Sequence, residues 1–342
     1  MVINMFYLMR NNLTKVVTII LLFFIFSCDS IDKTSFPKIA KGDRAIAFIQ
    51  SNSEIFASID KEGGFGDIVF YIFDDSSTYK VTDNNFYEES LTCSPNNNSL
   101  LFASSKKYLF TNKENRATYY HGLYFLNFEN ETYEKFGKKN TKLDAIHRFE
   151  GLQWTDNGIY FSSYNNKIYC ADSSKKMNIV MEIENDWRIY NQLISSNEKI
   201  LIFNSIRSDP LTKMGLGIYD IEKSELVWLF NDKRTWKEAG KVQDWSKNDS
   251  SFVYTNFGLH SYNVYTQEIE EVSIPGVGSD IIIEEFKYLN ENEFVFIYRD
   301  INTNITNPTY DNFIGVYNVK NHKFTTLNTP NRQKTFLTVI NR

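Results

Sequence analysis

Three glutamates stand at matching places along the chain, and their spacing points most directly to chemistry. Glu89, Glu150 and Glu284 each lie four residues before the residue that leads into a polar turn, and Tyr190 and Lys241 stand at the same place in two further repeats. Carboxylates gathered in one place can bind a cation such as Ca²⁺ or attract a basic partner, and they shift each other's pKa. The same residues also suit ordinary solvated strand ends. We expect a binding role for them, with Ca²⁺ as an alternative, and assign no metal site or other cofactor.

The common catalytic and metal-binding motifs are missing from the sequence. There is no His-Glu-x-x-His or Cys-x-x-Cys spacing, no Gly-x-Ser-x-Gly elbow and no phosphate-binding loop. The glycine-rich stretch 63–66 lacks the spacing of such a loop. The histidines are scattered, at His121, His147, His260 and His322. We therefore predict no catalytic residue.

Two short segments combine tryptophan with arginine. Trp187 and Arg188 lie in the segment 186–190, and Arg234 and Trp236 lie in the segment 234–237. Both residue types are frequent anchors at protein interfaces, and a tryptophan can also stack on a sugar. The alternative is that each tryptophan caps a hydrophobic core between neighbouring elements. These four residues are candidate binding residues, and both interpretations stay open.

A recurring sequence pattern, called the repeated phrase below, shows which elements must position these candidates. An aromatic residue followed by small or polar residues ends a strand six times, at intervals of about 48 residues. Polar turns rich in Asn, Asp, Ser and Gly precede most copies, because these residues tolerate the backbone of tight turns. The copies begin at Phe56, Phe102, Phe161, Phe203, Tyr254 and Phe296.

A second marker, an apolar strand that ends in Asp or Asn, recurs in parallel with the first. A further polar turn and a short strand follow it, so that each unit holds four short strands joined by hairpins. Units of four strands and about 48 residues are typical of β-propeller blades. Six such units account for most of the chain, and we predict an all-β, six-bladed propeller of four-stranded antiparallel blades, with seven blades as an alternative. The second marker ends at Asp74, Asn127, Asp172, Asp220, Asn263 and Asn318.

The repeated phrase resembles the Trp-Ser-Pro-Asp-Gly repeat of TolB-type (WD40-like) six-bladed propellers. Ser94-Pro95 keeps the Ser-Pro pair and Gly158 keeps the turn glycine, so the repeats are degenerate. The resemblance covers roughly residues 44–340. It implies the fold and a habit of binding proteins or small ligands.

The end of the chain offers a strand beyond the sixth unit. Residues 335–340 are expected to join the sheet of the first unit, which would close the ring and remove exposed sheet edges. In one arrangement residues 44–49 remain the innermost strand of that sheet. In the other they shift outward and the C-terminal strand becomes innermost.

The N-terminal segment has the pattern of a secretory signal. Arg10 and Lys15 precede an apolar run that ends at Phe26, which is too short to span a bilayer but suits a signal peptide. The sequence before Cys28 resembles a bacterial lipobox, and the bulky Phe26 matches lipoproteins of the Bacteroidetes type. This resemblance implies lipidation, such as palmitate, on Cys28. An ordinary signal peptide with an incidental cysteine is the alternative.

These signals divide the chain into a signal peptide (1–27), a lipid-anchored tether (28–42) and the propeller (43–342). They predict a bacterial cell-envelope protein, with the outer membrane favoured and the leaflet open. The other cysteines, Cys93 and Cys170, fall at different positions of different repeats, so we expect them to remain unpaired.

Composition agrees with a strand-rich globular domain. Hydrophobic residues make up 42% and aromatic residues 16% of the chain, and aromatic side chains fit the half-buried surface of a sheet. The net charge of −5 is mild and no basic stripe is present, which argues against nucleic acid as a partner.

Long insertions are expected on one face of the propeller. They follow the second strand of a unit or link two units, and these two kinds of connection share a face. Binding residues concentrate on loops held by a rigid scaffold, although such loops can also be merely tolerated. We predict an envelope-anchored, non-enzymatic protein that binds a protein or glycan there. The alternative is a propeller enzyme, metal-dependent and lactonase-like or polysaccharide-acting, that uses the acidic residues. The insertions are 106–122, 207–215 and 299–312, with the links 137–150, 184–191 and 231–241.

Overall fold

The computed structural model describes most of the chain from Ile39 onward. Within the described part every regular element is a β-strand, and no helix there is long and apolar enough to cross a membrane. Cys28 and the expected signal peptide lie outside it. The described ranges are 39–51, 66–83, 87–111, 117–136, 149–163, 165–207, 213–232, 240–256, 258–278, 280–300, 312–330 and 332–342.

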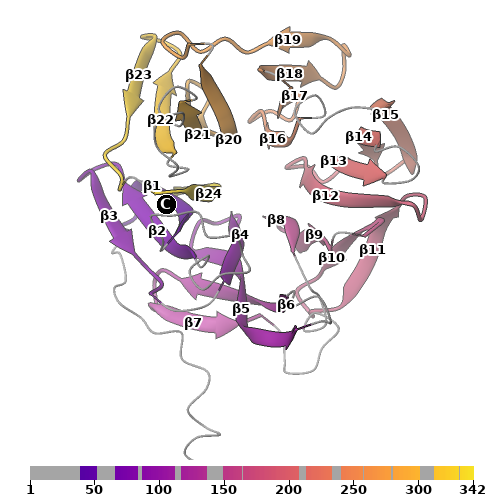
Figure 1. Ribbon diagram of the computed structural model, residues 1–342, viewed down its shortest axis with the longest axis horizontal. Coiled ribbons are helices and arrows are strands. Elements are labelled where there is room, and N and C mark those ends of the chain that lie inside the picture. Colours follow the sequence, from indigo (N-terminus) through magenta and orange to yellow (C-terminus); the bar gives the residue numbers. More distant parts are fainter. Residues whose placement is uncertain are drawn as a thin grey trace, which may run out of the picture.

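Twenty-four strands form six four-stranded sheets, which stand as blades around a central axis (Figure 1). Blade 1 contains β24 (Lys334–Asn341), β1 (Arg44–Ser51), β2 (Gly66–Ile72) and β3 (Ser77–Lys80). Blade 2 contains β4 (Tyr87–Cys93), β5 (Ser99–Thr111), β6 (Ala117–Asn127) and β7 (Thr132–Lys135). Blade 3 contains β8 (Glu150–Trp154), β9 (Ile159–Ser162), β10 (Lys167–Ala171) and β11 (Met177–Glu182).

The other three blades repeat the arrangement. Blade 4 contains β12 (Trp187–Ile194), β13 (Ile200–Arg207), β14 (Lys213–Asp220) and β15 (Glu225–Asp232). Blade 5 contains β16 (Val242–Trp245), β17 (Ser251–Thr255), β18 (Leu259–Asn263) and β19 (Ile269–Glu271). Blade 6 contains β20 (Ile281–Asn290), β21 (Glu293–Asp300), β22 (Phe313–Asn318) and β23 (Lys323–Thr326). Neighbouring strands are antiparallel, which confirms the predicted fold with six blades and not seven.

The first blade closes the ring with both ends of the chain. Its strand order is β24-β1-β2-β3, so the C-terminal strand is innermost and β1 is second. Ala45 pairs with Ile72 on one side and with Ile340 on the other. The innermost strands β24, β4, β8, β12, β16 and β20 contact each other in a closed circle. The second of the two arrangements expected from the sequence is therefore correct, and the copy of the aromatic phrase at Phe56 lies outside the described residues.

Apolar side chains fill the spaces between adjacent blades. Each space holds one main cluster, such as the one between blades 2 and 3, where Phe149 and Phe161 lie edge to face at 5.0 Å. The aromatic residues of the repeated phrase explain this core, because they sit on the second strand of a blade and are buried. The buried members are Phe102, Phe161, Phe203, Tyr254 and Phe296.

Three of the predicted polar turns share one hydrogen-bond pattern. Ser94, Ser195 and Ser246 each accept a backbone N–H from five residues later at 3.0 Å, and each donates its hydroxyl to an asparagine two residues later. The residue after that asparagine has a positive φ in every case. These residues are Asn97, Glu198 and Asp249.

The two faces of the propeller differ in their strand connections. On the short-turn face, the innermost strands end and compact turns such as 94–98, 195–199 and 246–250 lead into the second strands. On the opposite side, the long-connection face, the innermost strands begin. The chain leaves and re-enters the blades there between β1 and β2, β13 and β14, and β21 and β22.

The chain enters the propeller on the short-turn face. Arg44, the first residue of β1, pairs with Asn341 at the end of the innermost strand β24. Just before it, Ile39 is buried in the core cluster between blades 1 and 2. The carboxyl-terminal residue Arg342 holds this entry, because its backbone N–H bonds Asp43 and its guanidinium bonds the Ile39 carbonyl. The last residues of the expected tether therefore pack against the propeller.

Candidate functional site

Each innermost strand carries a β-bulge near its beginning, on the long-connection face. A bulge sets two residues of one strand against one of its neighbour and redirects the side chains around it. Ser90, Gly151 and Phe336 take positive φ values of 55°, 60° and 56° at these points. We call the bulged beginnings of the six strands the inner-strand ring. The register breaks at 89/91, 150/153, 189/191, 242/244 and 283/285, and in β24 opposite 47/49.

Polar side chains of this ring bind the main chain of the next blade. Glu89 Oε1 accepts the Phe149 N–H at 3.2 Å. Gln153 bonds Ile194 twice, accepting its N–H at 2.7 Å and donating to its carbonyl at 2.8 Å. The inner edge of an innermost strand has no neighbouring strand to pair with, so these amide and carboxylate groups satisfy backbone atoms that would otherwise lack partners.

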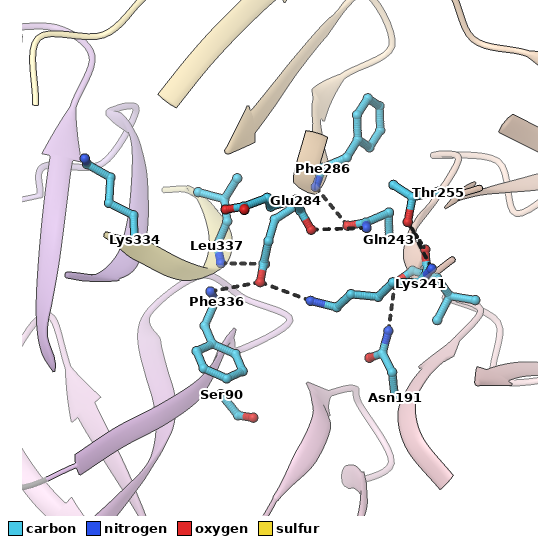
Figure 2. A network of polar contacts seen from close by, with 12 residues as sticks. Ser90, Asn191, Lys241, Gln243, Thr255, Glu284, Phe286, Lys334, Phe336 and Leu337 are labelled. Atoms are coloured by element: carbon cyan, nitrogen blue, oxygen red, sulfur yellow. Dashed lines mark hydrogen bonds and ion pairs between the residues drawn. The ribbon is translucent and has the colours of Figure 1, made fainter. Parts of the chain in front are cut away.

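Side chains of blades 4, 5 and 6 make the same kind of hydrogen bond to the main chain of a neighbouring blade. Asn191 donates to the Val242 carbonyl at 2.8 Å, and Asp244 accepts the Tyr288 N–H at 2.9 Å. Gln243 spans the next gap: it donates to the Glu284 carbonyl at 3.3 Å and accepts an N–H from blade 6 at 3.0 Å, as Figure 2 shows. The ring is therefore held by carboxamide and carboxylate contacts to the main chain.

Glu285 is the most heavily bonded carboxylate of the ring. It accepts the N–H groups of Phe336 at 3.1 Å and Leu337 at 3.0 Å, and its Oε1 lies 3.1 Å from Lys241 Nζ (Figure 2). Burial acts to raise the pKa of Glu285, but the Lys241 charge and the two backbone donors outweigh it and hold the pKa below its ordinary value. A carboxylate held ionised in this way links blades 5, 6 and 1 and is poorly suited to donate a proton.

Glu284 and Asn312 form a second contact set near the beginning of β20. Glu284 accepts the Asn312 amide at 2.8 Å and lies 3.3 Å from Arg299 Nε. Asn312 is buried, and its side chain also bonds both main-chain groups of Lys334. The predicted residue Glu284 is thus tied to blade 1 through Asn312.

Lys334 is a buried cation at the beginning of β24. Its ammonium donates to the carbonyls of Asn312 at 2.8 Å, Pro330 at 2.7 Å and Arg332 at 2.8 Å, which uses all three of its protons. A buried charge needs such partners, because its transfer from water costs several kcal/mol per ion. Lys334 therefore anchors the closing strand.

The structure places the three predicted glutamates on the inner strands of three blades. Glu89 is buried and bonded to blade 3, whereas Glu150 and Glu284 are partly exposed. Within the described residues no three His, Cys, Asp or Glu side chains are grouped so that they could hold a metal ion. The two other cysteines are free, and burial raises the pKa of the Cys93 thiol to about 12.

The predicted tryptophan and arginine candidates differ in their surroundings. Trp187 is buried and stacks on Trp228 at 5.1 Å, so it caps the core between blades 3 and 4. Arg188 is exposed, and its guanidinium bonds the carbonyls of Asn185 at 2.8 Å and Trp187 at 3.0 Å. Arg234 and Trp236 lie outside the described residues.

A two-stranded ribbon extends blade 2 on the long-connection face. β5 and β6 pair as far as Thr111 and Ala117, whereas β4 pairs with β5 only up to Ser105 and β7 with β6 only up to Tyr124. The segment expected as a loop at 106–122 therefore begins and ends as paired strand. It projects beyond the other strands of its blade.

Several residues in and around the ring were not identified from the sequence, among them Glu285, Lys334 and Asn312. Glu285 lies next to the predicted Glu284. Counting back from a turn assumes regular pairing and does not reveal the bulge, at which the register shifts between Ile283 and Glu285. Lys334 is the first residue of β24, and Asn312 directly precedes β22. The two residues are far apart in the sequence, and only the lysine at the start of the apolar closing strand gave a signal, which is weak.

Comparisons with known proteins agree on the fold. No protein-family model and no curated protein sequence matches the chain. TolB from Acinetobacter baumannii superimposes with a TM-score of 0.57 at 13% identity, over 86% of this chain and 66% of TolB. The putative TolB from Agrobacterium tumefaciens gives a TM-score of 0.54 at 12% identity, over 83% of this chain and 88% of that protein. At this identity the likeness concerns the fold alone, and this chain has the six-bladed propeller fold of TolB.

Proposed function

We propose that this chain is a lipid-anchored protein of the bacterial cell envelope that binds a protein or glycan partner with its long-connection face and catalyses no reaction. The observation that carries the proposal is the β5–β6 ribbon. It projects from the face on which the long connections lie, and projecting loops and ribbons on a rigid scaffold are common binding elements.

The chemistry of the inner-strand ring supports binding over catalysis. Glu89, Gln153, Gln243 and Glu285 are each hydrogen-bonded to the main chain of the next blade. General acid–base catalysis needs a group whose pKa lies near the working pH, and the pKa of Glu285 is lowered instead. These side chains hold the scaffold together.

The place where the chain enters the propeller supports the use of the opposite face for binding. Residue 44 begins β1 on the short-turn face, and Cys28 lies 11 residues before the buried Ile39. A chain of that length spans at most about 40 Å when fully extended. A lipid on Cys28 would therefore join the membrane to the propeller at the short-turn face and leave the long-connection face, with the ribbon, free to bind a partner.

The test is affinity capture of the full chain after crosslinking in cells, with a tag joined behind Arg342 through a flexible linker. We compare the wild type, Cys28→Ser, and a variant in which 106–120 is replaced by Asn-Gly, a two-residue hairpin turn. Lys175→Gly, in a turn of the short-turn face with φ of 67°, serves as the matched control.

We expect a stoichiometric partner with the wild type and the control, and its loss from the trimmed variant. Loss with Cys28→Ser would show that the anchor is needed. Capture of the same partner by the trimmed variant would disprove the ribbon's role. Stoichiometric Ca²⁺ in the purified protein, lost in Glu150→Ala, would instead favour an enzyme with acidic residues.

A further inference from the structure

The outer rim between blades 4 and 5 exposes an unusual amount of apolar surface. Among the described residues, Tyr265 is 69%, Val227 60% and Ile269 53% exposed. Only three other large apolar side chains of the described part are exposed: Ile179 and Val319 in other blades, and Leu226 on the opposite face of β15. Exposed apolar groups that gather in one place mark interaction sites, whereas single ones need no explanation.

Strand pairing shows that the side chains of Val227 and Ile269 face the same space. Val227 on β15 lies opposite Ile218, and Ile269 on β19 lies opposite Tyr262. Directly opposite residues share a face of a sheet. Ile218 and Tyr262 both belong to the core cluster between blades 4 and 5. Val227 and Ile269 therefore lie on the two walls of that inter-blade space, at its outer end.

Each wall also carries a carboxylate. Side chains two residues apart in a strand point to the same face, so Glu225 accompanies Val227 and Glu271 accompanies Ile269. Both glutamates are exposed, and Glu225 interacts electrostatically with Lys223 in the preceding turn, a lysine that is already paired with Asp220. β15 and β19 contain four acidic and no basic residues. The rim is therefore apolar and acidic.

β15 has the length to accept another strand. It is outermost in its sheet and eight residues long, whereas the outermost strands of the other blades have three to six residues. It contains no lysine or proline, the residues with which proteins often protect such edges. Its pairing with β14 is regular from Glu225 to Trp228, and a bulge follows.

We propose that this rim binds an extended segment of a partner protein, which adds a strand to β15 and carries apolar residues flanked by Lys or Arg. Main-chain hydrogen bonds to the outer edge of the regular part of β15, from Glu225 to Trp228, would supply affinity, and the alternating side chains would supply specificity. This surface is separate from the long-connection face. The proposal therefore does not depend on the function proposed above.

A second copy of this chain does not suit the rim. Antiparallel pairing of β15 with itself in the register that overlaps all eight residues would place Glu225 opposite Asp232 at both ends, and like charges directly opposite each other are destabilising. Basic flanks remove that repulsion. The charge of the two walls therefore favours a basic partner segment.

The probe is the capped, fluorescent heptapeptide Lys-Thr-Val-Thr-Val-Thr-Lys, in which lysines and valines share one face. Its binding to the full chain in detergent is measured by fluorescence anisotropy. We expect Val227→Lys to weaken binding by about tenfold or more, through lost apolar contact and added repulsion. Ile179→Lys, at an equally exposed apolar position of blade 3, should change it by less than about twofold.

Two further experiments identify the mode of binding. The peptide with all five internal residues N-methylated should not bind, because neither of its edges can then donate the main-chain hydrogen bonds of a strand. The variant Glu225→Lys/Glu271→Lys should prefer the peptide with Glu in place of Lys. Lack of binding by the wild type at 1 mM peptide, equal loss in Val227→Lys and Ile179→Lys, or binding of the methylated peptide would each overturn the proposal. Concentration-dependent dimerisation abolished by Val227→Lys would also overturn it, in favour of a second copy.

Discussion

Glu285 Oε1 lies 3.1 Å from Lys241 Nζ, and the pair joins the innermost strand of blade 6 to the beginning of blade 5. The same carboxylate receives two N–H groups from the closing strand β24. One side chain thus connects three blades, including the blade that contains both ends of the chain.

Replacing Glu285 by Ala should strongly destabilise the propeller. Two buried N–H groups would lose their acceptor, and Lys241 would lose its counter-charge. We expect a decrease of about 3 kcal/mol in the free energy of unfolding, measured with urea and tryptophan fluorescence. Lys241→Met should cost less, about 1 kcal/mol, because the lysine side of the pair is partly solvated and Glu285 keeps its two backbone donors. Glu291→Ala, at an exposed turn of the same blade, is the control, and an equal loss there would contradict the assignment.

Stability should fall at acidic pH through Glu285 and Glu293. Both carboxyl groups have a pKa below their ordinary value of 4.5. A lowered pKa in the folded state contributes stability that is complete above the unfolded value and is lost as the pH falls through the folded value. We expect constant stability near neutral pH and a decline below about pH 4.5. Glu285→Gln should reduce the slope there by up to about 1.4 kcal/mol per pH unit, and an unchanged slope would rule out its contribution.

The repeated polar turns predict opposite effects for two matched substitutions. Asp249 accepts the Ser196 N–H at 3.0 Å, the Ser196 hydroxyl at 2.6 Å and the Asn197 N–H at 3.1 Å, so it links blades 4 and 5. Asp249→Gly should lower the melting temperature and cost about 2 kcal/mol. Asn97→Gly should be neutral or stabilise by a few tenths of a kcal/mol, because glycine adopts positive φ without strain. Destabilisation by both variants to the same extent would show that Asp249 forms no effective link.

Gly151 should tolerate no side chain. Its φ is 60°, and a Cβ there would lie 2.5 Å from Gln192 N and 2.8 Å from Gln192 O, which are main-chain atoms of the neighbouring blade. We expect Gly151→Ala to cost about 3 kcal/mol in chemical unfolding, through strain and displacement of the inner-strand ring. Gly278→Ala, where a Cβ would contact nothing within 4 Å, is the matched control and should have no effect. A tolerated Gly151→Ala would mean that the bulge can relax.

The blade architecture was predictable because its signals are local and repeated. Serine and asparagine at fixed spacing specify the turns at Ser94, Ser195 and Ser246, and a buried aromatic residue follows each on the next strand. Each of the six copies departs from the pattern at some positions, but together they identify the repeated unit. The order of strands in blade 1 was not predictable, because residues 44–49 suit an innermost or a second strand equally well.

The candidate site was less predictable because its contacts join distant parts of the chain. The partner of Trp187 is Trp228, on the outermost strand of the same blade, and residue types alone could not distinguish this stacking from an exposed anchor. The bulge before Glu285 shifts the side chains by one place. Counting from the turn therefore selected Glu284, although the more heavily bonded carboxylate is its neighbour.

The C-terminal strand also sets an order of events for the living cell. β24 is synthesised after the other strands of the propeller, so the inner edge of β1 has no partner until β24 has left the ribosome. A message truncated by a few codons would yield a product with an open β1 edge and an unfilled place between blades 6 and 2, which proteases and chaperones recognise as unfinished. The ring is therefore complete only when the strand made latest has joined the strand made earliest.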